Sequence, residues 1–563
     1  MIKLLSLLAT LSLSISAIAA DLNQARLLVD QKRYDEALAV YEVLIAAQPG
    51  QSDLLIESGR VNAWADRHSE AAKLYMQAIV VDPRRRYDVL LPLAWQLAWG
   101  GHHDEAIPLF REVVQQVPAQ KTEALHGLAE SLAASNQLLP ALDVYRTLSV
   151  DPADLKARKG EARILGWLER HDEAILRYRA ILDTHPGDKE AQIGLARALN
   201  YSGSHFEAVI AYAAAIENDP ALARDTRTER ATALRWAGLE DAALTTLGDA
   251  PGNDSVSLRS RLGQETAPHV RAEFESSWDS DDLDIDALGL GWQQRFGFGR
   301  WLDVSARSAY IDQDGDQIDG RQLLIKGGTR LGSVEQGLFW PALTVGVRDY
   351  DGWQTAAWKL QGRWLPADFW RIDLEAGNDV VETIDALKEE VTITAVAAST
   401  DWRFAPRWSA TLGGAVLRFD DDNRRTRLTG RVEHVVKTAQ PRLVLGLEGM
   451  GFNDSDPTST IDDRGYYNPE RYRELKFFAH AEHETDGWLL EARLALGKLW
   501  ETPWFAASDD SGLYAWQLSA ARDLAPGLRL RLYAGGSDSS AFLQGTGSGY
   551  TRNYLGASLI WFY

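Results

Sequence analysis

Two spacings of hydrophobic and polar positions divide this chain. Apolar residues recur at helical intervals up to about residue 250, as in "RYDEALAVYEVLIAAQP" (33–49), and they alternate with polar residues from about residue 269, as in "WLDVSARSAY" (301–310). Recurrence at three and four residues predicts amphipathic helices, whereas strict alternation predicts strands whose two faces meet different surroundings. The pattern therefore predicts an α + β protein of two domains, the first helical and the second built of strands.

The helical part repeats itself about every 34 residues. A proline closes most units, because proline lacks the N–H that would continue the second helix of a pair. Such pairs bury their apolar stripes only by stacking on one another. The arrangement resembles the tetratricopeptide repeat, and it predicts an α-solenoid over residues 21–250. A small residue recurs at the point where two helix backbones approach closely: Ala37, Ala71, Ala106, Ala141, Ala174, Ala208 and Ala242.

Aromatic residues recur at one position of this array, seven residues before the repeat alanine. Two interpretations stay open: packing at the end of the first helix of each pair, or a repeat surface on which sugar rings stack. Acidic residues in "HHDEA" (102–106) and "RHDEA" (170–174) fall in the first turn of the second helix, where carboxylates favour the helix dipole, so no metal site is predicted there. The aromatic residues are Trp64, Trp99, Trp167 and Tyr201.

The alternating part divides into sixteen predicted strands, and an even number is typical of outer-membrane β-barrels. Connections alternate between long ones, such as residues 379–390 and 453–471, and short ones, such as residues 366–367 and 486–487. Such barrels have long external loops and short periplasmic turns. We therefore predict a 16-stranded antiparallel transmembrane β-barrel over residues 269–563, after a polar linker at residues 251–268. The strands are predicted at 269–278, 284–297, 299–311, 318–331, 336–350, 353–365, 368–378, 391–405, 407–420, 424–438, 440–452, 472–485, 487–500, 511–524, 527–537 and 549–563.

The last predicted strand, "RNYLGASLIWFY" (552–563), alternates to the final residue. A barrel must pair its last strand with its first, because an unpaired edge finds no hydrogen-bond partner in lipid. We expect Leu559, Trp561 and Tyr563 to face lipid at a membrane interface. A terminal aromatic strand also resembles the signal read by the outer-membrane barrel-insertion machinery, which is therefore an expected partner.

Composition and the N-terminus narrow the setting. Residues 1–20 have a positive start, a short apolar run and small residues for cleavage after Ala19 or Ala20, which predicts a signal peptide; a retained anchor is the alternative. A formal charge of −21 argues against a nucleic-acid partner. The chain has no cysteine, so disulfides and thiolate-bound metals are excluded. Twenty tryptophans fit membrane-interface girdles or sugar-stacking surfaces.

Repeats followed by a sixteen-stranded barrel resemble the exopolysaccharide export porins of Gram-negative bacteria, of the poly-β-1,6-N-acetylglucosamine and cellulose exporter type. A local likeness is "GYYNP" (465–469), which resembles a segment that precedes a strand in both exporter barrels. The resemblance implies a pore in the outer membrane for a linear polysaccharide of the biofilm matrix. It also implies periplasmic repeats that dock periplasmic or inner-membrane proteins of polysaccharide synthesis or modification, and it implies no cofactor.

Charges of both signs occupy the predicted inward positions of the barrel. Such a lumen suits a neutral or weakly charged chain, which can exchange hydrogen bonds along the wall; for any single residue, simple hydration of the wall is the alternative. The lumen candidates are Glu273, Glu275, Asp303, Arg307, Arg363, Arg371, Asp373, Glu375, Arg427, Arg431, Glu433, Glu474, Lys476, Glu482, Glu491, Arg493, Arg529 and Arg531.

Two other classes of function stay open beside export. One is a plugged structural or receptor barrel whose repeats scaffold periplasmic partners, and the other is a barrel enzyme acting on lipid or glycan. No catalytic residue, cofactor or metal is predicted, and the chain is not expected to be an enzyme. The run "GTGSG" (545–549) precedes a strand and is no phosphate loop, and "DQDGD" (312–316) is interpreted as a solvated loop rather than a weak divalent-ion site.

Overall fold

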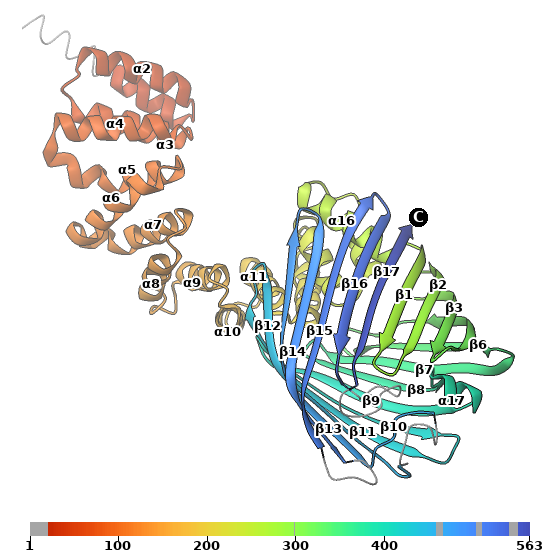
Figure 1. Ribbon diagram of the computed structural model, residues 1–563. Coiled ribbons are helices and arrows are strands. Elements are labelled where there is room, and N and C mark those ends of the chain that lie inside the picture. Colours follow the sequence, from red (N-terminus) through yellow and green to blue (C-terminus); the bar gives the residue numbers. More distant parts are fainter. Residues whose placement is uncertain (1–20, 298, 458–464, 503–508, 540–549) are drawn as a thin grey trace, which may run out of the picture. The chain divides into compact units, whose positions relative to one another are not determined.

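The computed structural model describes residues 21–297, 299–457, 465–502, 509–539 and 550–563 (Figure 1). The predicted signal peptide and "GTGSG" lie outside the described residues. The chain divides into two compact units, Met1–Ala198 and Leu199–Tyr563, each of which is described by itself.

The first unit is built of paired helices, as the repeat pattern predicts. Residues 21–30 are helical, and helix α11 (Lys189–Ser202) crosses into the second unit. The pairing depends on small residues: an added Cβ at Gly160 or Gly194 would collide with the ring of Tyr145 or Tyr178 on the preceding helix. The other elements are α2 (Tyr34–Ala47), α3 (Ser52–Trp64), α4 (His68–Val81), η1 (Pro83–Arg85), α5 (Arg86–Trp99), α6 (His103–Gln116), η2 (Pro118–Gln120), α7 (Lys121–Ala134), α8 (Leu138–Leu148), α9 (Leu155–Trp167) and α10 (His171–Leu182).

The second unit begins with helices and not with the barrel. They are α12 (His205–Asn218), α13 (Leu222–Asp225), α14 (Arg227–Trp236), α15 (Glu240–Leu247) and α16 (Asn253–Thr266). The compact unit thus starts at residue 199, whereas the sequence placed the domain boundary near residue 250. The helices of the final repeats belong to the same compact unit as the barrel, although their sequences continue the repeat pattern of the solenoid.

Two sequence interpretations need correction in this region. The stretch predicted as a polar linker contains α16, because Leu258 and Leu262 form a narrow apolar stripe at helical spacing, and Leu262 is fully buried beside Ala243 and Leu247. The seventh repeat alanine is Ala243, which is fully buried, and not Ala242, which is only half-buried. The other six repeat alanines are fully buried, as expected.

Among the described residues, sixteen strands close into an antiparallel barrel, because the seventeen-stranded sheet includes β5, which pairs only with β6. First and last strands pair over their whole length, from His269 opposite Phe562 to Asp279 opposite Arg552 (Figure 1). The predicted closure is confirmed. The strands are β1 (His269–Asp279), β2 (Leu283–Arg295), β3 (Trp301–Gln313), β4 (Asp316–Gly328), β5 (Leu331–Ser333), β6 (Gly337–Tyr350), β7 (Trp353–Ala367), β8 (Trp370–Val380), β9 (Thr392–Ala405), β10 (Trp408–Phe419), β11 (Arg424–Lys437), β12 (Arg442–Asp454), β13 (Arg471–Thr485), β14 (Trp488–Thr502), β15 (Asp509–Ala525), β16 (Leu528–Ser537) and β17 (Arg552–Phe562).

One connection is shorter than the sequence suggested. The "DQDGD" segment is a hairpin in which only Asp314 and Gly315 separate β3 from β4, and both have positive φ. An Asp-Gly pair favours this turn because both central positions need left-handed backbone. The described residues contain no cluster of three or more His, Cys, Asp or Glu side chains that could hold a metal ion.

The outer face of the barrel is apolar and carries aromatic residues near both ends. Leu559, Trp561 and Tyr563 are exposed on this face, and Tyr563 accepts a 2.7 Å hydrogen bond from the indole N–H of Trp292. Aromatic girdles of this kind mark the two interfaces of a membrane barrel. Exposed aromatics include Trp364, Trp370, Trp402 and Trp408 at the short-turn end, and Trp278, Tyr310, Trp500 and Tyr514 at the other. None of the helices formed by the described residues is long and apolar enough to cross a membrane.

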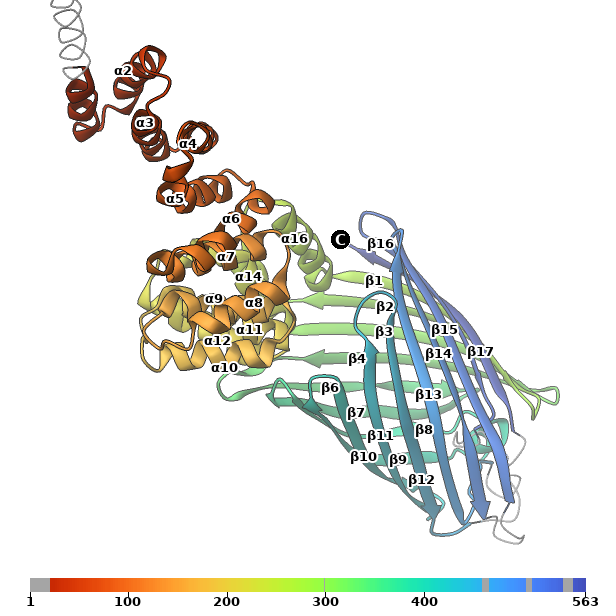
Figure 2. The same ribbon diagram turned by 90° about the vertical axis from the view of Figure 1, so that its left-hand side faces the viewer.

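Helices of the second unit dock on the short-turn end of the barrel (Figure 2). Phe206, Ala237 and Leu338 form a buried apolar cluster there, with Trp340 packed against it. The docking is also polar, and it involves three separate connections between strands and the end of strand β9. Asp241 accepts from the Gly299 N–H at 2.9 Å, Arg330 donates to the Gly238 carbonyl at 3.2 Å, Asp368 accepts from the Phe206 N–H at 2.6 Å, and Arg403 donates to the Gly203 carbonyl at 2.7 Å.

Asp368 and His205 give this junction an expected pH dependence. Burial raises the pKa of the Asp368 carboxyl to about 6, and burial beside Arg403 lowers the pKa of His205 to about 4. The contribution of Asp368 to stability therefore grows as the pH falls through about 6, since the folded protein holds the proton more tightly. The contribution of His205 is present above about pH 6.5 and is lost as the pH falls toward about 4.

Replacing Asp368 by Asn should expose the His205 effect. Between about pH 7 and pH 5, we expect Asp368→Asn to lose on the order of 1–2 kcal/mol more stability than the wild type, because nothing then offsets His205. The measurement is the thermal midpoint of helix loss in the full-length protein in detergent. The double variant His205→Gln/Asp368→Asn is the control, and its midpoint should change least with pH. A midpoint of Asp368→Asn that follows the wild type at both pH values would contradict the assignment.

Candidate functional site

The inner wall of the barrel carries the charged residues that the sequence indicated. Every predicted lumen candidate lies on the inward row of its strand, opposite in parity to the exposed outer leucines such as Leu428 and Leu532. Their part in transport stays a prediction. What the structure adds is their pairing, because most of them contact a charge of opposite sign on the same strand or on a strand one or two places away.

Ion pairs hold the side chains of the wall in place. Asp303 pairs with Arg271 at 2.8 Å, and Glu448 pairs with Arg493 at 2.5 Å. Paired charges offer hydrogen bonds while their fields largely cancel. Pairing partners that the sequence interpretation missed include Arg271, Lys359, Asp401 and Glu448; the same inward parity could have identified them.

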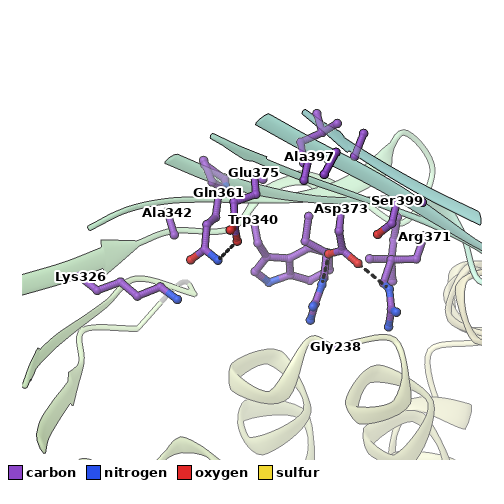
Figure 3. A pocket seen from close by; sticks show the side chains of 18 of the residues that line it. Gly238, Lys326, Trp340, Ala342, Gln361, Arg371, Asp373, Glu375, Ala397 and Ser399 are labelled. Atoms are coloured by element: carbon purple, nitrogen blue, oxygen red, sulfur yellow. Dashed lines mark hydrogen bonds and ion pairs between the residues drawn. The ribbon is translucent and has the colours of Figure 1, made fainter. Parts of the chain in front are cut away.

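A cavity of about 810 Å³ lies between the docked helices and the wall at the short-turn end (Figure 3). We call it the vestibule. Trp236 at the end of α14, Trp301 on β3 and Trp340 on β6 line it. Figure 3 shows Trp340 reaching from the wall toward the helix end at Gly238, where an added Cβ would lie 3.4 Å from the indole. None of these three aromatics stood out in the sequence, because they come from distant segments.

Charged residues on β7 and β8 form one side of the vestibule. Asp373 accepts from Arg363 at 2.7 Å and from Arg371 at 2.9 Å, and Arg371 also pairs with Asp401. Glu375 accepts from Gln361 at 2.9 Å. The adjoining part of the wall, on β9 and β10, carries small side chains and so leaves the space open. These small residues include Ala397, Ser399, Gly413 and Ala415.

A short helix occupies the lumen toward the long-connection end. Helix α17 (Ile384–Lys388) lies in the connection between β8 and β9. Ile384 and Leu387 are buried against inward residues of β2, β3, β4 and β6, while Ala386 packs with residues of β9 and β10. The helix therefore touches two separate arcs of the wall. The inward rows near this end are apolar and not polar as predicted, because they form the seat of α17: Leu283, Ile285, Ala309, Ile311 and Ile318.

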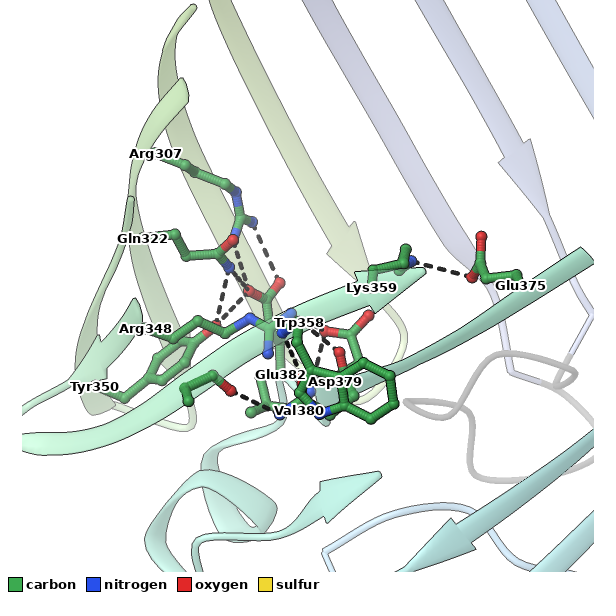
Figure 4. Close-up of polar contacts among 12 residues, drawn as sticks. Arg307, Gln322, Arg348, Tyr350, Trp358, Lys359, Glu375, Asp379, Val380 and Glu382 are labelled. Atoms are coloured by element: carbon green, nitrogen blue, oxygen red, sulfur yellow. Dashed lines mark hydrogen bonds and ion pairs between the residues drawn. The ribbon is translucent and has the colours of Figure 1, made fainter. Parts of the chain in front are cut away.

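Glu382 ties this helix to the polar wall (Figure 4). Its carboxylate accepts from Arg307 at 2.5 Å, from the Tyr350 hydroxyl at 2.9 Å and from Gln322 at 3.4 Å. A second cavity, of about 650 Å³, lies beside this cluster and is lined by Arg307, Glu382 and other polar residues. The polar path from the vestibule thus leads to α17.

The structure shows that the "GYYNP" segment has a packing role, since all five of its residues are buried. Gly465 has a φ of +72°, accepts from the Thr383 hydroxyl and leaves no room for a Cβ beside Ala386. The Tyr466 ring stacks on Phe419 at 4.2 Å. The segment thus packs against α17 inside the barrel. We call α17 and residues 465–469 together the outer plug.

A buried ion pair fixes the other side of the plug. Arg425 and Asp454 contact each other at 2.9 Å, and both side chains are almost wholly inaccessible to solvent. Arg425 also donates to the Tyr467 carbonyl and lies 4.2 Å from the Phe452 ring. Removal of either charge would leave its partner buried without a counter-charge. We therefore expect the pair to hold this end of the plug in one arrangement.

The repeat-surface candidates are exposed more than packed. Each aromatic ring has a partial contact, such as Trp99 on Trp95 at 5.2 Å and Trp167 beneath the Arg163 guanidinium at 5.6 Å. The position seven residues before Ala243 adds Trp236 to the set. Their use as a sugar surface stays a prediction. The exposed fractions are 52% for Trp64, 58% for Trp99, 53% for Trp167 and 65% for Tyr201.

Comparison with known families bears on both parts of the chain. Residues 335–485, which include β6 to β13 and the described part of the outer plug, match the family model for the PgaA membrane beta barrel domain. This part of the chain is a PgaA-type membrane barrel domain. Residues 22–88 and 160–223 match the tetratricopeptide repeat model. The predicted combination of repeats with a barrel of this family is therefore confirmed.

Solved structures similar to this chain fall into the same two groups. A bacterial polysaccharide outer membrane secretin is 12% identical, with a TM-score of 0.43 over 53% of this chain and 99% of that one. A tetratricopeptide repeat protein from Parabacteroides merdae is 16% identical, with a TM-score of 0.37 over 44% of this chain and 98% of that one. YrrB, described as a TPR protein with an unusual peptide-binding site, is 20% identical, with a TM-score of 0.28 over 30% and 88%. No curated protein matches the chain.

Proposed function

We propose that the protein is an outer-membrane pore through which a linear exopolysaccharide leaves the cell. The observation that carries the proposal is a wall of paired charges that leads from the vestibule to the outer plug inside a PgaA-type barrel. Such a wall offers hydrogen bonds at many points and holds a sugar chain tightly at none. A neutral or weakly charged polymer suits it, of the poly-N-acetylglucosamine or cellulose type found in biofilms.

The connections between strands support one orientation of the barrel in the membrane. Outer-membrane barrels keep short turns on the periplasmic side and long loops outside. The docked helices contact the short-turn end, so the vestibule is the proposed entrance for the polymer and the outer plug is the proposed exit. The direct test is a deletion strain: polymer should accumulate in the periplasm, and normal secretion would overturn the export function.

Export should depend on the polarity of the lumen more than on one residue. Arg371→Ala should change conductance less than about twofold, because Asp373 keeps its contact with Arg363. Reversing both Glu273 and Glu275 to Lys should shift ion selectivity toward anions, since two negative groups on the open wall become positive. Planar-bilayer recordings under a salt gradient measure both effects, with each substitution made in a barrel whose outer plug is released by Glu382→Gln and compared with Glu382→Gln alone. Unchanged selectivity in the double reversal would contradict a lumen lined by these side chains.

The repeats of the first unit are the proposed docking module for proteins of polymer synthesis or modification. Their support is the stacked helix pairs, which typically present a long binding surface. A fragment of residues 21–202 should be soluble and helical, and it should capture a periplasmic or inner-membrane component of that apparatus. A folded fragment that captures none would refute the docking role while leaving the pore unaffected.

The outer plug favours one alternative, a barrel that is permanently closed and acts as a structural or receptor protein. Its apolar seat and the Glu382 contacts would suit that role as well. The two functions differ in one measurable property, because only a pore should conduct when the plug is displaced.

A further inference from the structure

We propose that the vestibule is a binding site for uncharged sugar units, in which Trp236, Trp301 and Trp340 provide stacking faces. The inference rests on the proposed export function, and it adds a defined ligand class and a place for it in the chain. It starts from the three tryptophans that line one cavity of about 810 Å³ at the short-turn end.

The aromatic residues are available to a ligand. Trp236 is 42% exposed, and Trp301 and Trp340 are half-buried, so their rings are not consumed by core packing. Trp236 is held from behind by His205, with ring centroids 5.2 Å apart, and Trp340 by the apolar docking cluster. A ring that is fixed on one side and free on the other loses little entropy on binding. The C–H bonds of a pyranose face are weakly positive and complement the negative face of an indole.

The polar groups of the vestibule suit hydroxyl and acetamido groups. Asp373 and Glu375 on the wall are already paired, with Arg363, Arg371 and Lys359. They therefore have little capacity left to bind a free ammonium group. Their remaining lone pairs, and the remaining N–H groups of the three cationic partners, can still serve neutral hydroxyls. A few fixed polar groups beside stacking faces are the usual makeup of a small-molecule site.

The shape of the vestibule also fits a chain rather than a compact ligand. The small residues of β9 and β10 adjoin the charged row of β8 and leave space along the wall on that side. On the other side, the vestibule adjoins the second cavity. The two cavities share Lys326 and Gln361 in their linings. A sugar oligomer bound in the vestibule would thus have its next units directed into the lumen.

The test uses the full-length protein in detergent and chitopentaose, a neutral N-acetylglucosamine oligomer, titrated by calorimetry. The wild type should bind it, and Trp236→Ala and Trp301→Ala should each weaken binding about tenfold, since one stacking face is worth roughly one factor of ten. Ser399→Trp should abolish binding by filling the space while leaving every aromatic residue in place. The control is Trp370→Ala, because Trp370 is also 42% exposed but lies on the outer face, and its affinity should equal that of the wild type.

Three results would overturn the site. They are no binding by the wild type, unchanged binding in both Trp236→Ala and Ser399→Trp, or an equal loss in Trp370→Ala. Tighter binding of the deacetylated, cationic pentamer would overturn the ligand class. Heat-modifiable gel mobility of each variant verifies that its barrel is folded. Failure of the export function is separate. It would appear as absent conductance in the variant Glu382→Gln/Ile384→Ser/Leu387→Ser, which releases the outer plug, while its chitopentaose binding is intact.

Discussion

Release of the outer plug should turn a nearly closed barrel into a conducting one. Glu382→Gln removes the charge that accepts from Arg307, Tyr350 and Gln322, and charged hydrogen bonds of this kind contribute about 1.5–3 kcal/mol. The open fraction should therefore rise about tenfold or more in planar-bilayer recordings. A stronger variant adds Ile384→Ser and Leu387→Ser, which remove two side chains buried against the wall and should open the barrel further.

A matched control lies on the same short helix. Lys388 pairs with Asp316 at 2.5 Å, but both side chains are about half-exposed, and exposed pairs contribute little to stability. Lys388→Gln should therefore leave the conductance as in the wild type. If the triple variant also conducts no better than the wild type, the barrel is closed by something other than the plug, and the structural or receptor function gains support. A large steady conductance in the wild type would show that α17 is no barrier.

Deletion of residues 552–563 should abolish assembly of the barrel. The last strand pairs with both β1 and β16, so its loss leaves two strand edges whose N–H and C=O groups have no partner in lipid. Each unsatisfied group costs several kcal/mol, and no local rearrangement supplies partners for a whole strand. The truncated protein should give no heat-modifiable band in outer-membrane fractions and should be degraded by periplasmic proteases.

The appropriate control removes a segment of similar length outside the ring of strands. Deleting residues 382–390 takes away α17 but breaks no pair of the barrel, so this variant should assemble. Comparing the two deletions separates loss of closure from a general effect of shortening the chain. Normal assembly of the protein lacking residues 552–563 would show that β17 is not needed to close the barrel.

The strands were predictable to within a few residues because their two faces meet different environments, lipid on the outside and the polar lumen on the inside. In β3, for example, alternate residues meet lipid and the lumen, so a shift of one residue would place Asp303 and Arg307 in lipid. The repeats were predictable for a related reason, since each recurring small residue lies where a neighbouring helix packs closely against it. The errors in the prediction arose where one sequence pattern is compatible with two structures. Ala242 and Ala243, for example, are adjacent, and only packing decides which of them is buried.

The sequence by itself determined the solenoid, the number of barrel strands, their closure and the inward row of charges. All of these depend on periodicities that are local in the chain. Only the tertiary structure decided that α16 is a helix docked beside the barrel, that α17 occupies the lumen, and that three distant tryptophans meet in one vestibule. The apolar residues around Ile384 have no periodic partner nearby; they are explained only by the inward rows of β2 to β6, which closure of the barrel brings to them.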